Sequence, residues 1–357
     1  MEFCLYHPEL GYYMSGKERT GARGDYFTAS DLHPVFARLI ARQVAEMWDV
    51  MGRPDQFTVA ELGAGRGLFA VDFLDWTRPV LTDFDQRLEY IAVEPSPRVR
   101  GRICQRLVES GLTGRARFLP SLEAMTPITG CFFSNELLDA LPVAVIVRLD
   151  GRLKEIYVEA VQNELREKPG PISDSTIAAA VAPYAHLLED GQRMEVSRTM
   201  SVFAQKLSEK LLRGFILTVD YGDRAENLYS SARRRGTLLA YRSHFATENF
   251  YDVPGEQDLT AHVNFSALIE AGKQAGLELA GFTTQERFLM SLGEANQFAD
   301  LYDRGMSEKE KLQARLKLKR LLNPAGMGST YKVLIQRRGV EAAPLTGLRY
   351  AKPWRRP

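Results

Sequence analysis

The chain has 357 residues, a formal net charge of +1 at pH 7, 45% hydrophobic residues and 25% charged residues. This is the composition of an ordinary globular protein, which excludes a polybasic nucleic-acid coat, a disordered tail protein and a collagen-like fibre. Its length suits about two domains, or one elaborated α/β domain. No apolar stretch approaches the ~18 residues that a membrane span needs.

The cysteines and the amino terminus bear on the compartment. Cys4, Cys104 and Cys131 lie far apart and are odd in number, so neither a disulfide framework nor a Cys-x-x-Cys site is available. The first 13 residues, MEFCLYHPELGYY, lack a basic start followed by an apolar signal core. The sequence therefore predicts a reducing, cytoplasmic location.

The predicted elements alternate between helices and strands from residue 34 onward. Apolar residues spaced by three and four predict a helix that begins at Pro34 and ends before Gly52. A buried strand over 57–60 then runs into a glycine loop and a second amphipathic helix, and the unit repeats with a strand over 90–93. Further strands are predicted at 116–119, 130–134, 215–219, 277–283 and 331–336. This alternation implies a mostly parallel sheet covered by helices on both faces.

Two other local signals complete the organisation. Asp150-Gly151 between apolar runs predicts a hairpin over 143–161, an insertion in the sheet. Ser307 and Glu310 form a capping-box pattern that opens a helix ending by Pro324. The predicted domains are an amino-terminal substrate-side segment (1–33), a cofactor-binding domain (34–142 and 196–337), a hairpin and helical insertion (143–195) and a carboxy-terminal tail (338–357).

The glycine loop is the strongest functional signal. Residues 61–67 read acid-x-Gly-x-Gly-x-Gly directly after a buried strand, so the backbone there can approach a ligand closely. A dinucleotide fingerprint needs its third glycine where Leu68 stands, and no Gly-Lys-Ser/Thr of a P-loop follows. Glu94 ends the next strand, where a carboxylate can accept hydrogen bonds from ribose hydroxyls. Two plainer interpretations remain: the loop packs a helix on a strand, and Glu94 is a solvated strand end.

The loop and its two acids favour S-adenosylmethionine as the cofactor. This molecule has no phosphate, so its site does not need a basic residue, and its sulfonium and ammonium charges favour nearby carboxylates. The predicted cofactor-binding residues are Glu61, Gly63, Gly65, Gly67, Glu94 and Ser134.

The predicted catalytic residues follow the fourth strand. Asn135 and Glu136 lie at its polar corner, where substrate and methyl group would meet. If a helical turn starts there, Glu136 and Asp139 share a face and could hold a guanidinium by bidentate hydrogen bonds. The alternative is that both acids only complement the dipole of a helix start. The five histidines have no metal-ligand spacing, so no metal site is predicted.

Several segments together resemble one family. They are 5–13 (LYHPELGYY), 24–28 (GDYFT), 61–67, 94–97, 134–142 (SNELLDALP), 220–222, 236–238 and 258–263 (DLTAHV). The chain resembles the MidA family of S-adenosylmethionine-dependent methyltransferases, which includes a mitochondrial complex I assembly factor that methylates protein arginine. It departs from the family pattern at Ser30-Asp31, where a Pro-Glu pair is common, and in lacking a leading segment before Met1.

The resemblance implies a class I fold, with a seven-stranded Rossmann-like sheet and an amino-terminal segment that closes over the cleft. It also implies methylation of arginine on a partner protein such as a respiratory complex subunit, no nucleic-acid partner, and a mitochondrial matrix location in a eukaryote. The substrate-side residues predicted from the family-like segments are His7, Tyr13, Asp25, Thr28 and His262. The histidines could instead be held by hydrogen bonds in loops. An aromatic cluster could wall a pocket for a flat cation or anchor the amino-terminal segment on the core; its members are Tyr6, Tyr12, Tyr13, Tyr26 and Phe27.

Two other functional classes remain open. A non-catalytic assembly chaperone could retain the same fold, and an NAD-linked oxidoreductase could use a similar sheet. Leu68 argues against the oxidoreductase.

Overall fold

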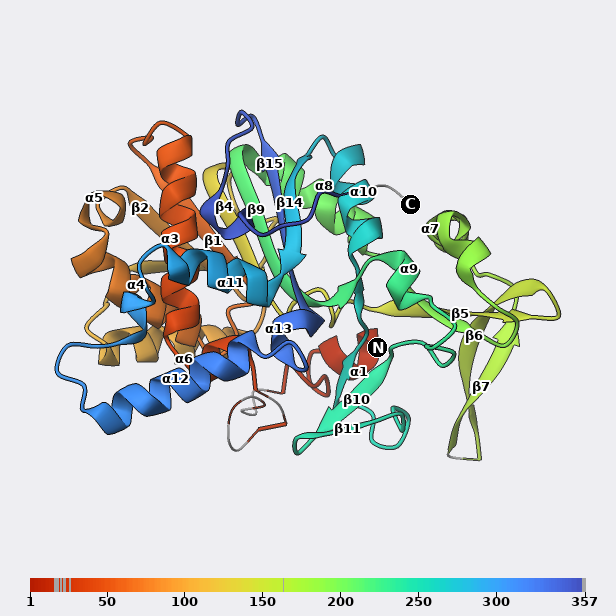
Figure 1. Cartoon of the computed structure of the whole chain (residues 1–357). Helices are drawn as coiled ribbons and strands as arrows, with labels where there is room; N and C mark the ends of the chain where they lie inside the picture. The colour runs from red at the N-terminus through yellow and green to blue at the C-terminus, as the bar shows by residue number, and fades with distance from the viewer. Residues whose placement is uncertain (16–18, 20, 22–23, 26, 163, 355–357) are drawn as a thin grey trace.

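A seven-stranded sheet forms the centre of the molecule. The computed structural model describes residues 1–354 apart from 16–18, 20, 22–23, 26 and 163 (Figure 1). The strand order is β14-β15-β9-β4-β1-β2-β3, and a short strand β13 also pairs with β9. Pairing is parallel from β9 to β3, and β15 is antiparallel to both of its neighbours. The strands are β1 (Phe57–Leu62), β2 (Leu88–Val93), β3 (Ala116–Leu119), β4 (Ile128–Asn135), β9 (Leu211–Asp223), β13 (Val263–Asn264), β14 (Glu278–Thr284) and β15 (Tyr331–Arg338). The predicted mostly parallel α/β sheet is confirmed.

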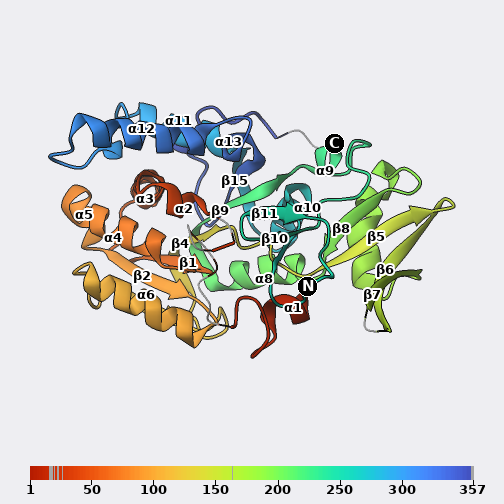
Figure 2. The same cartoon turned by 90° about the horizontal axis from the view of Figure 1, so that it is seen from below.

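Helices cover both faces of this sheet, as the view in Figure 2 shows. Successive residues of β4 sort to opposite sides: Cys131 and Phe133 join the core under α3, α4 and α11, whereas Phe132 packs with residues of α8. This is the two-residue period of a strand buried on both faces. The helices are α1 (Glu2–Tyr6), α2 (Ala29–Leu32), α3 (Val35–Val50), α4 (Leu68–Val80), α5 (Thr82–Asp85), α6 (Pro97–Glu109), α7 (Ser175–Val181), α8 (Met200–Lys210), α9 (Ala225–Leu228), α10 (Phe265–Gln274), α11 (Gln285–Glu294), α12 (Glu308–Leu322) and α13 (Met327–Thr330), with 3-10 turns at Ala182–Leu187, Ala299–Leu301 and Thr346–Leu348.

Local sequence signals explain where several elements begin. The capping box at Ser307 and Glu310 is formed at the start of α12, as predicted. Asp150 and Gly151 both adopt positive φ angles, 51° and 72°, and join β5 to β6 as the predicted hairpin. None of the helices within the described ranges is both long enough and apolar enough to cross a membrane.

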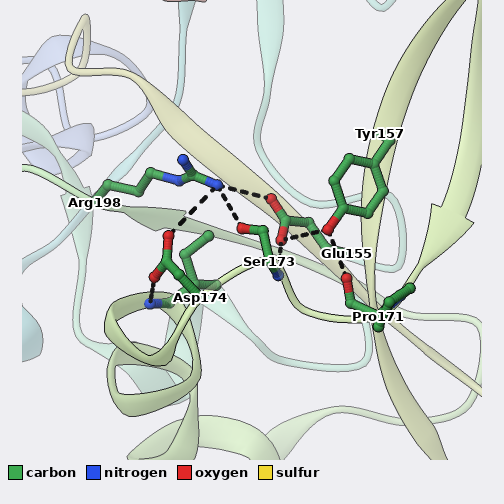
Figure 3. A network of polar contacts seen from close by, with 7 residues as sticks. Glu155, Tyr157, Pro171, Ser173, Asp174 and Arg198 are labelled. Atoms are coloured by element: carbon green, nitrogen blue, oxygen red, sulfur yellow. Dashed lines mark hydrogen bonds and ion pairs between the residues drawn. The ribbon is translucent and has the colours of Figure 1, made fainter.

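The insertion is a separate four-stranded antiparallel sheet in the order β7-β6-β5-β8. Its strands are β5 (Val143–Leu149), β6 (Arg152–Val161), β7 (Glu164–Gly170) and β8 (Arg193–Ser197), so the sheet continues two residues past 195. Arg198 fastens it: Nη2 donates to Glu155 Oε1 at 3.1 Å and to Ser173 Oγ at 2.7 Å (Figure 3). Tyr157 also donates to the Pro171 carbonyl at 2.6 Å.

A third, small sheet lies beside the amino-terminal segment. It consists of β11 (Phe245–Thr247), β10 (Leu239–Arg242) and β12 (Asp258–Thr260). Leu5 and Tyr12 pack against Ala140, Ala240 and Leu259 in one apolar cluster. The segment before α2 is therefore attached both to the small sheet and to the loop that follows β4.

Candidate active site

A cavity of about 430 Å³ lies at the carboxyl ends of β1, β2 and β4. This edge of an open α/β sheet is where such folds bind ligands. Its lining includes side chains from three strand ends and from the amino-terminal segment, namely Glu61, Glu94, Asn135, Glu136, Tyr6, Tyr13, Thr28 and Asp31. The cavity therefore joins the predicted cofactor residues to part of the predicted substrate side.

The three loop glycines have different surroundings. All three adopt left-handed conformations, with φ of 70° at Gly63, 51° at Gly65 and 72° at Gly67. A Cβ at Gly65 would meet only the Gly63 carbonyl, at 3.9 Å, so the backbone there faces open space. A Cβ at Gly67 would lie 2.6 Å from Ile103, and Gly67 is not part of the cavity lining. Gly63 and Gly65 thus line the cavity, whereas Gly67 packs α4 against α6.

Glu61 is a buried carboxyl that no basic side chain within the described ranges neutralises. Its Oε2 accepts a hydrogen bond of 2.7 Å from the Tyr90 hydroxyl of β2. Burial raises the pKa of Glu61 to about 8; the Tyr90 hydrogen bond opposes this and the charge of Glu94 adds to it. A carboxyl in this state ionises more readily when a cation binds beside it.

Glu94 is held at the end of β2 by backbone donors. Its Oε1 accepts the Ser96 N–H at 3.0 Å, and the Gly65 N–H also bonds to this carboxyl. Burial raises the pKa of Glu94, while these hydrogen bonds and the guanidinium groups of Arg100 and Arg102 lower it. The hydrogen bonds fix the carboxylate at the tip of β2, next to the glycine loop.

The end of β4 places Asn135 and Glu136 at the cavity, while Ser134 is buried in the strand and does not line it. The Oδ1 atom of Asn135 is buried without a hydrogen-bond partner. Among the described residues, the donors to Glu136 are all neutral: Ala29 N–H at 3.2 Å, Asn135 Nδ2 at 3.1 Å and the Tyr331 hydroxyl at 2.9 Å. Burial raises the pKa of Glu136 to about 8, and the charge of Asp139 adds to this.

The predicted helical turn over 136–139 does not form, so the expectation that Glu136 and Asp139 share a helix face is wrong. Glu136 has a φ of 53°, and the following N–H groups of Leu137 and Leu138 donate to Asp220 at 3.1 and 2.8 Å. The helix-dipole alternative fails for the same reason. Asp139 does not line the cavity, and its Oδ2 accepts from the Tyr221 hydroxyl.

The sequence analysis missed three residues that bond to the acids or tyrosines of this site: Tyr221, Asp258 and Tyr331. Tyr331 and Tyr221 donate to Glu136 and Asp139, and Tyr13 donates to Asp258 at 2.7 Å. Burial, with the charge of Asp139, raises the pKa of Asp258 to about 7. Tyr221 and Asp258 lie in the segments 220–222 and 258–263 that carried the family resemblance, so that signal was present; nothing in the sequence marks Tyr331.

The structure divides the predicted substrate-side residues. Tyr13 and Thr28 line the cavity. Asp25 is buried and accepts from Tyr12 and from the Ser243 N–H, both at 2.7 Å. The other two lie elsewhere: His7 Nδ1 accepts N–H bonds within its own loop, and His262 lines a second cavity.

The aromatic cluster divides in the same way. Tyr6 and Tyr13 line the cavity, whereas Tyr12 is fully buried as an anchor. Tyr26 lies outside the described residues.

These residues fit S-adenosylmethionine. The cavity offers a glycine backbone that a side chain would obstruct, two carboxyls at neighbouring strand ends and an unpartnered amide oxygen on Asn135. Within the described part of the chain, the carboxyls of Glu61 and Glu136 have neutral hydrogen-bond donors, which suits a positively charged molecule. Among the described residues, no group of three or more metal-ligating side chains comes together.

Comparisons with known proteins agree with this chemistry. The model of the family described as "Putative S-adenosyl-L-methionine-dependent methyltransferase" matches residues 39–283. A crystal structure of a Burkholderia thailandensis protein bound to S-adenosyl-homocysteine has a TM-score of 0.88 and 31% identity, covering 98% of this chain and 89% of that one. Among curated proteins, the mitochondrial protein arginine methyltransferase NDUFAF7 homolog of Drosophila melanogaster is 27% identical over 97% of this chain and 82% of its own length. The human protein arginine methyltransferase NDUFAF7 is 25% identical over 93% of this chain and 77% of its own length. The chain therefore belongs to this family of S-adenosylmethionine-dependent methyltransferases, and the resemblance to the MidA family is confirmed.

Proposed function

We propose that this methyltransferase methylates an arginine side chain of a partner protein and that Glu136 binds the guanidinium. The names of the curated relatives support the substrate class. The observation that carries the proposal is Glu136 itself, a buried carboxyl at the cavity whose donors among the described residues are all neutral. A guanidinium supplies the missing positive charge and matches a carboxylate in a planar, bidentate pair.

For the cofactor we assign a role to each end of the glycine loop. Glu61 faces the amino group, the backbone at Gly63 and Gly65 lies against the bound molecule, and Glu94 accepts from the ribose hydroxyls. Ser134 and Gly67 do not line the cavity, so we give them structural roles: Ser134 is buried in β4, and Gly67 allows α4 to pack against α6.

The neighbours of Glu136 position it. Tyr331 fixes Oε2, while Asn135 Nδ2 and the Ala29 N–H fix Oε1. Asn135 Oδ1 remains free to accept an N–H of the substrate. Asp139 acts indirectly: its charge helps to raise the pKa of Glu136, so the Glu136 carboxyl can hold a proton near neutral pH.

The reaction needs alignment more than chemical assistance. S-adenosylmethionine, when bound, supplies an electrophilic methyl group on a positively charged sulfur. Glu136 holds the guanidinium so that one nitrogen faces this methyl group, and such orientation alone accelerates a displacement greatly. As the N–C bond forms and the S–C bond breaks, the methylated nitrogen loses one proton, which a Glu136 carboxylate oxygen accepts.

The test is Glu136→Gln, which keeps the shape of the side chain and removes its charge. Purified enzyme would be incubated with candidate partner proteins and labelled cofactor, and methylarginine would be measured by mass spectrometry. We expect methylarginine in the wild-type reaction and a large loss in the variant, with cofactor affinity by calorimetry nearly unchanged. Glu89→Gln is the matched control, because Glu89 lies on β2 and pairs with Thr58 and Arg117 outside the cavity.

The outcomes also separate the alternatives. Methyl groups found only on residues other than arginine would refute the substrate class while leaving the enzyme intact. Partner binding that persists in a Gly65→Leu variant without any methylation by the wild type would favour the assembly chaperone. A respiratory complex subunit as the partner, and a cytoplasmic or matrix location, belong to the same proposal and rest on the family resemblance.

A further inference from the structure

A second cavity, of about 490 Å³, lies between the insertion sheet and the small sheet. Its lining includes Glu167 of β7, Arg193 of β8, Arg233 and Arg235 of the connecting loop, and His262. Two segments of the family resemblance, 236–238 and 258–263, contribute residues here, although the cofactor cavity does not use these residues. Neither the methyl transfer nor the cofactor accounts for this cavity.

The walls of the second cavity are fixed by hydrogen bonds before any ligand arrives. Glu195 of the insertion sheet accepts from Thr237 N–H at 3.0 Å, Thr237 Oγ1 at 2.9 Å and Leu238 N–H at 3.3 Å. Gly236, at φ 80°, makes this approach possible, because a Cβ there would lie 2.0 Å from Glu195 Oε1. Thr237 Oγ1 also accepts the His262 N–H at 3.1 Å. The loop is therefore clamped to the insertion sheet.

The arginines that line this cavity are not all paired with carboxylates. Arg193 makes a bidentate pair with Glu167, at 2.9 and 2.5 Å, and Arg235 pairs with Glu248. Arg233 has no carboxylate partner among the described residues; its Nη1 contacts His262 Nδ1 at 3.2 Å. Burial and the charge of Arg233 lower the pKa of His262 to about 4, so the imidazole is neutral at pH 7. Among the described residues that line the cavity, Arg233 is therefore the arginine without a glutamate partner.

We propose that this second cavity is an anion site in which Arg233 binds a carboxylate. A guanidinium with free N–H groups and a partly enclosed position is the group best suited to bidentate carboxylate recognition. The unpaired guanidinium matches one monoanionic carboxylate, and the two lining glutamates, with Glu195 behind Thr237, oppose a doubly charged phosphate. The rings of Phe250 and Tyr251 pack edge to face with their centroids 4.6 Å apart, and they supply an apolar wall for the carbon chain that carries the carboxylate.

One layer of side chains separates this second cavity from Asp139, the acid whose charge acts on Glu136. His262 contacts the Tyr221 ring edge-on at 5.4 Å, and the neighbouring Ala261 N–H donates to the Asp139 carbonyl at 2.9 Å. The carboxylate can come from an acidic side chain of the partner protein or from a free carboxylic acid. The proposal does not depend on arginine being the methylated residue.

The test measures binding to the full chain by isothermal titration with two monoanionic probes: a peptide that is blocked at both ends and carries a single glutamate, and butyrate. We expect saturable binding that weakens about tenfold in Arg233→Ala, because one charge-assisted bidentate contact is lost. Arg234→Ala is the matched control: it removes the same charge one residue away, where Arg234 pairs with Glu189 at 3.0 Å outside the cavity. It should bind as the wild type does.

The pattern of results decides both the site and the source of the ligand. Binding of the peptide but not of butyrate assigns the carboxylate to a protein, and the reverse assigns it to a free acid. The proposal is overturned if neither probe binds saturably, or if Arg234→Ala weakens binding as much as Arg233→Ala. Cofactor binding, measured in the same samples, reports whether each variant is folded. If Arg233→Ala does not fold, Arg233→Lys replaces it; this variant keeps the charge but not the planar guanidinium, so its affinity for the probe should fall between those of the wild type and of a protein without the charge.

Discussion

The two cavities differ in how the chain treats buried charge. In the first, Glu61 and Glu136 receive hydrogen bonds, among the described residues, from tyrosine hydroxyls, an amide and a backbone N–H. In the second, the two glutamates that line the cavity are paired with arginines, and Arg233 is not. Burial with neutral donors raises the pKa of Glu61 and Glu136, so these carboxyls ionise more readily beside a bound cation, whereas the guanidinium of Arg233 suits an anion. Arginines also line the first cavity, so this contrast concerns the surroundings of Glu61 and Glu136.

The largest effect is expected from Glu136 in the first cavity. Removing a preorganised charged group that faces the reacting centre costs about 10²–10³ in rate. Glu136→Ala should therefore lower the single-turnover rate of methyl transfer by about that factor, measured with saturating cofactor. A rate within about threefold of the wild type would remove Glu136 from the reaction and with it the functional contrast between the cavities.

The buried acids of the first cavity and His262 of the second should change the free energy of unfolding in opposite directions as the pH changes. Glu61 and Glu136 have pKa values raised from 4.5 to about 8, so their burial destabilises the free protein as pH rises from about 4.5 through 8. His262 has a pKa lowered from 6.5 to about 4, so its burial destabilises the protein as pH falls from 6.5 through 4. The two windows overlap between pH 4.5 and 6.5, so only the carboxyls act from pH 6.5 to about 8, and there urea unfolding of the free enzyme should show stability falling as the pH rises.

The same measurement can assign the alkaline limb. Glu136→Gln should reduce the loss of stability between pH 6 and 9, by on the order of a few kcal/mol, because one buried carboxyl no longer ionises. A variant with an unchanged alkaline slope would show that Glu136 does not titrate in this range.

A smaller effect is expected at the ribose end of the first cavity. Glu94→Gln keeps the size of the side chain but removes a charged acceptor, which is worth about 1.5–3 kcal/mol. Calorimetry should show cofactor affinity reduced by about tenfold to a hundredfold, with Glu89→Gln as the control. An unchanged affinity would indicate that Glu94 is only a hydrogen-bonded strand end.

The smallest effect is expected in the insertion that carries one wall of the second cavity. The Arg198 side chain is 47% exposed, so its contacts with Glu155 and Asp174 are screened by solvent (Figure 3). Arg198→Ala should cost about 1 kcal/mol or less in thermal unfolding. Cofactor affinity should not change; a loss of cofactor binding would show that the two cavities are coupled.

Much of the cofactor end could be predicted from the sequence because its signals are local. A buried strand, three glycines and an amphipathic helix lie within about twenty consecutive residues, and backbone sterics alone require glycine at left-handed φ angles. The hairpin at Asp150-Gly151 and the capping box at Ser307 are equally local. The family-like segments added the substrate class, since they sample the chain at eight separate places.

Only the tertiary structure decided what happens after β4. The spacing of Glu136 and Asp139 suggested a helical turn, but Asp220, 83 residues after Leu137, accepts the N–H groups that a helix would have used. Tyr331 donates to Glu136 from the start of β15, the last strand in chain order. Arg233 has no carboxylate partner among the described residues because Glu167 and Glu248 are paired with other arginines. The sequence determined where each strand ends and which chemical groups stand there. The fold decided which of those groups are paired with an opposite charge, because that depends on neighbours from distant parts of the chain.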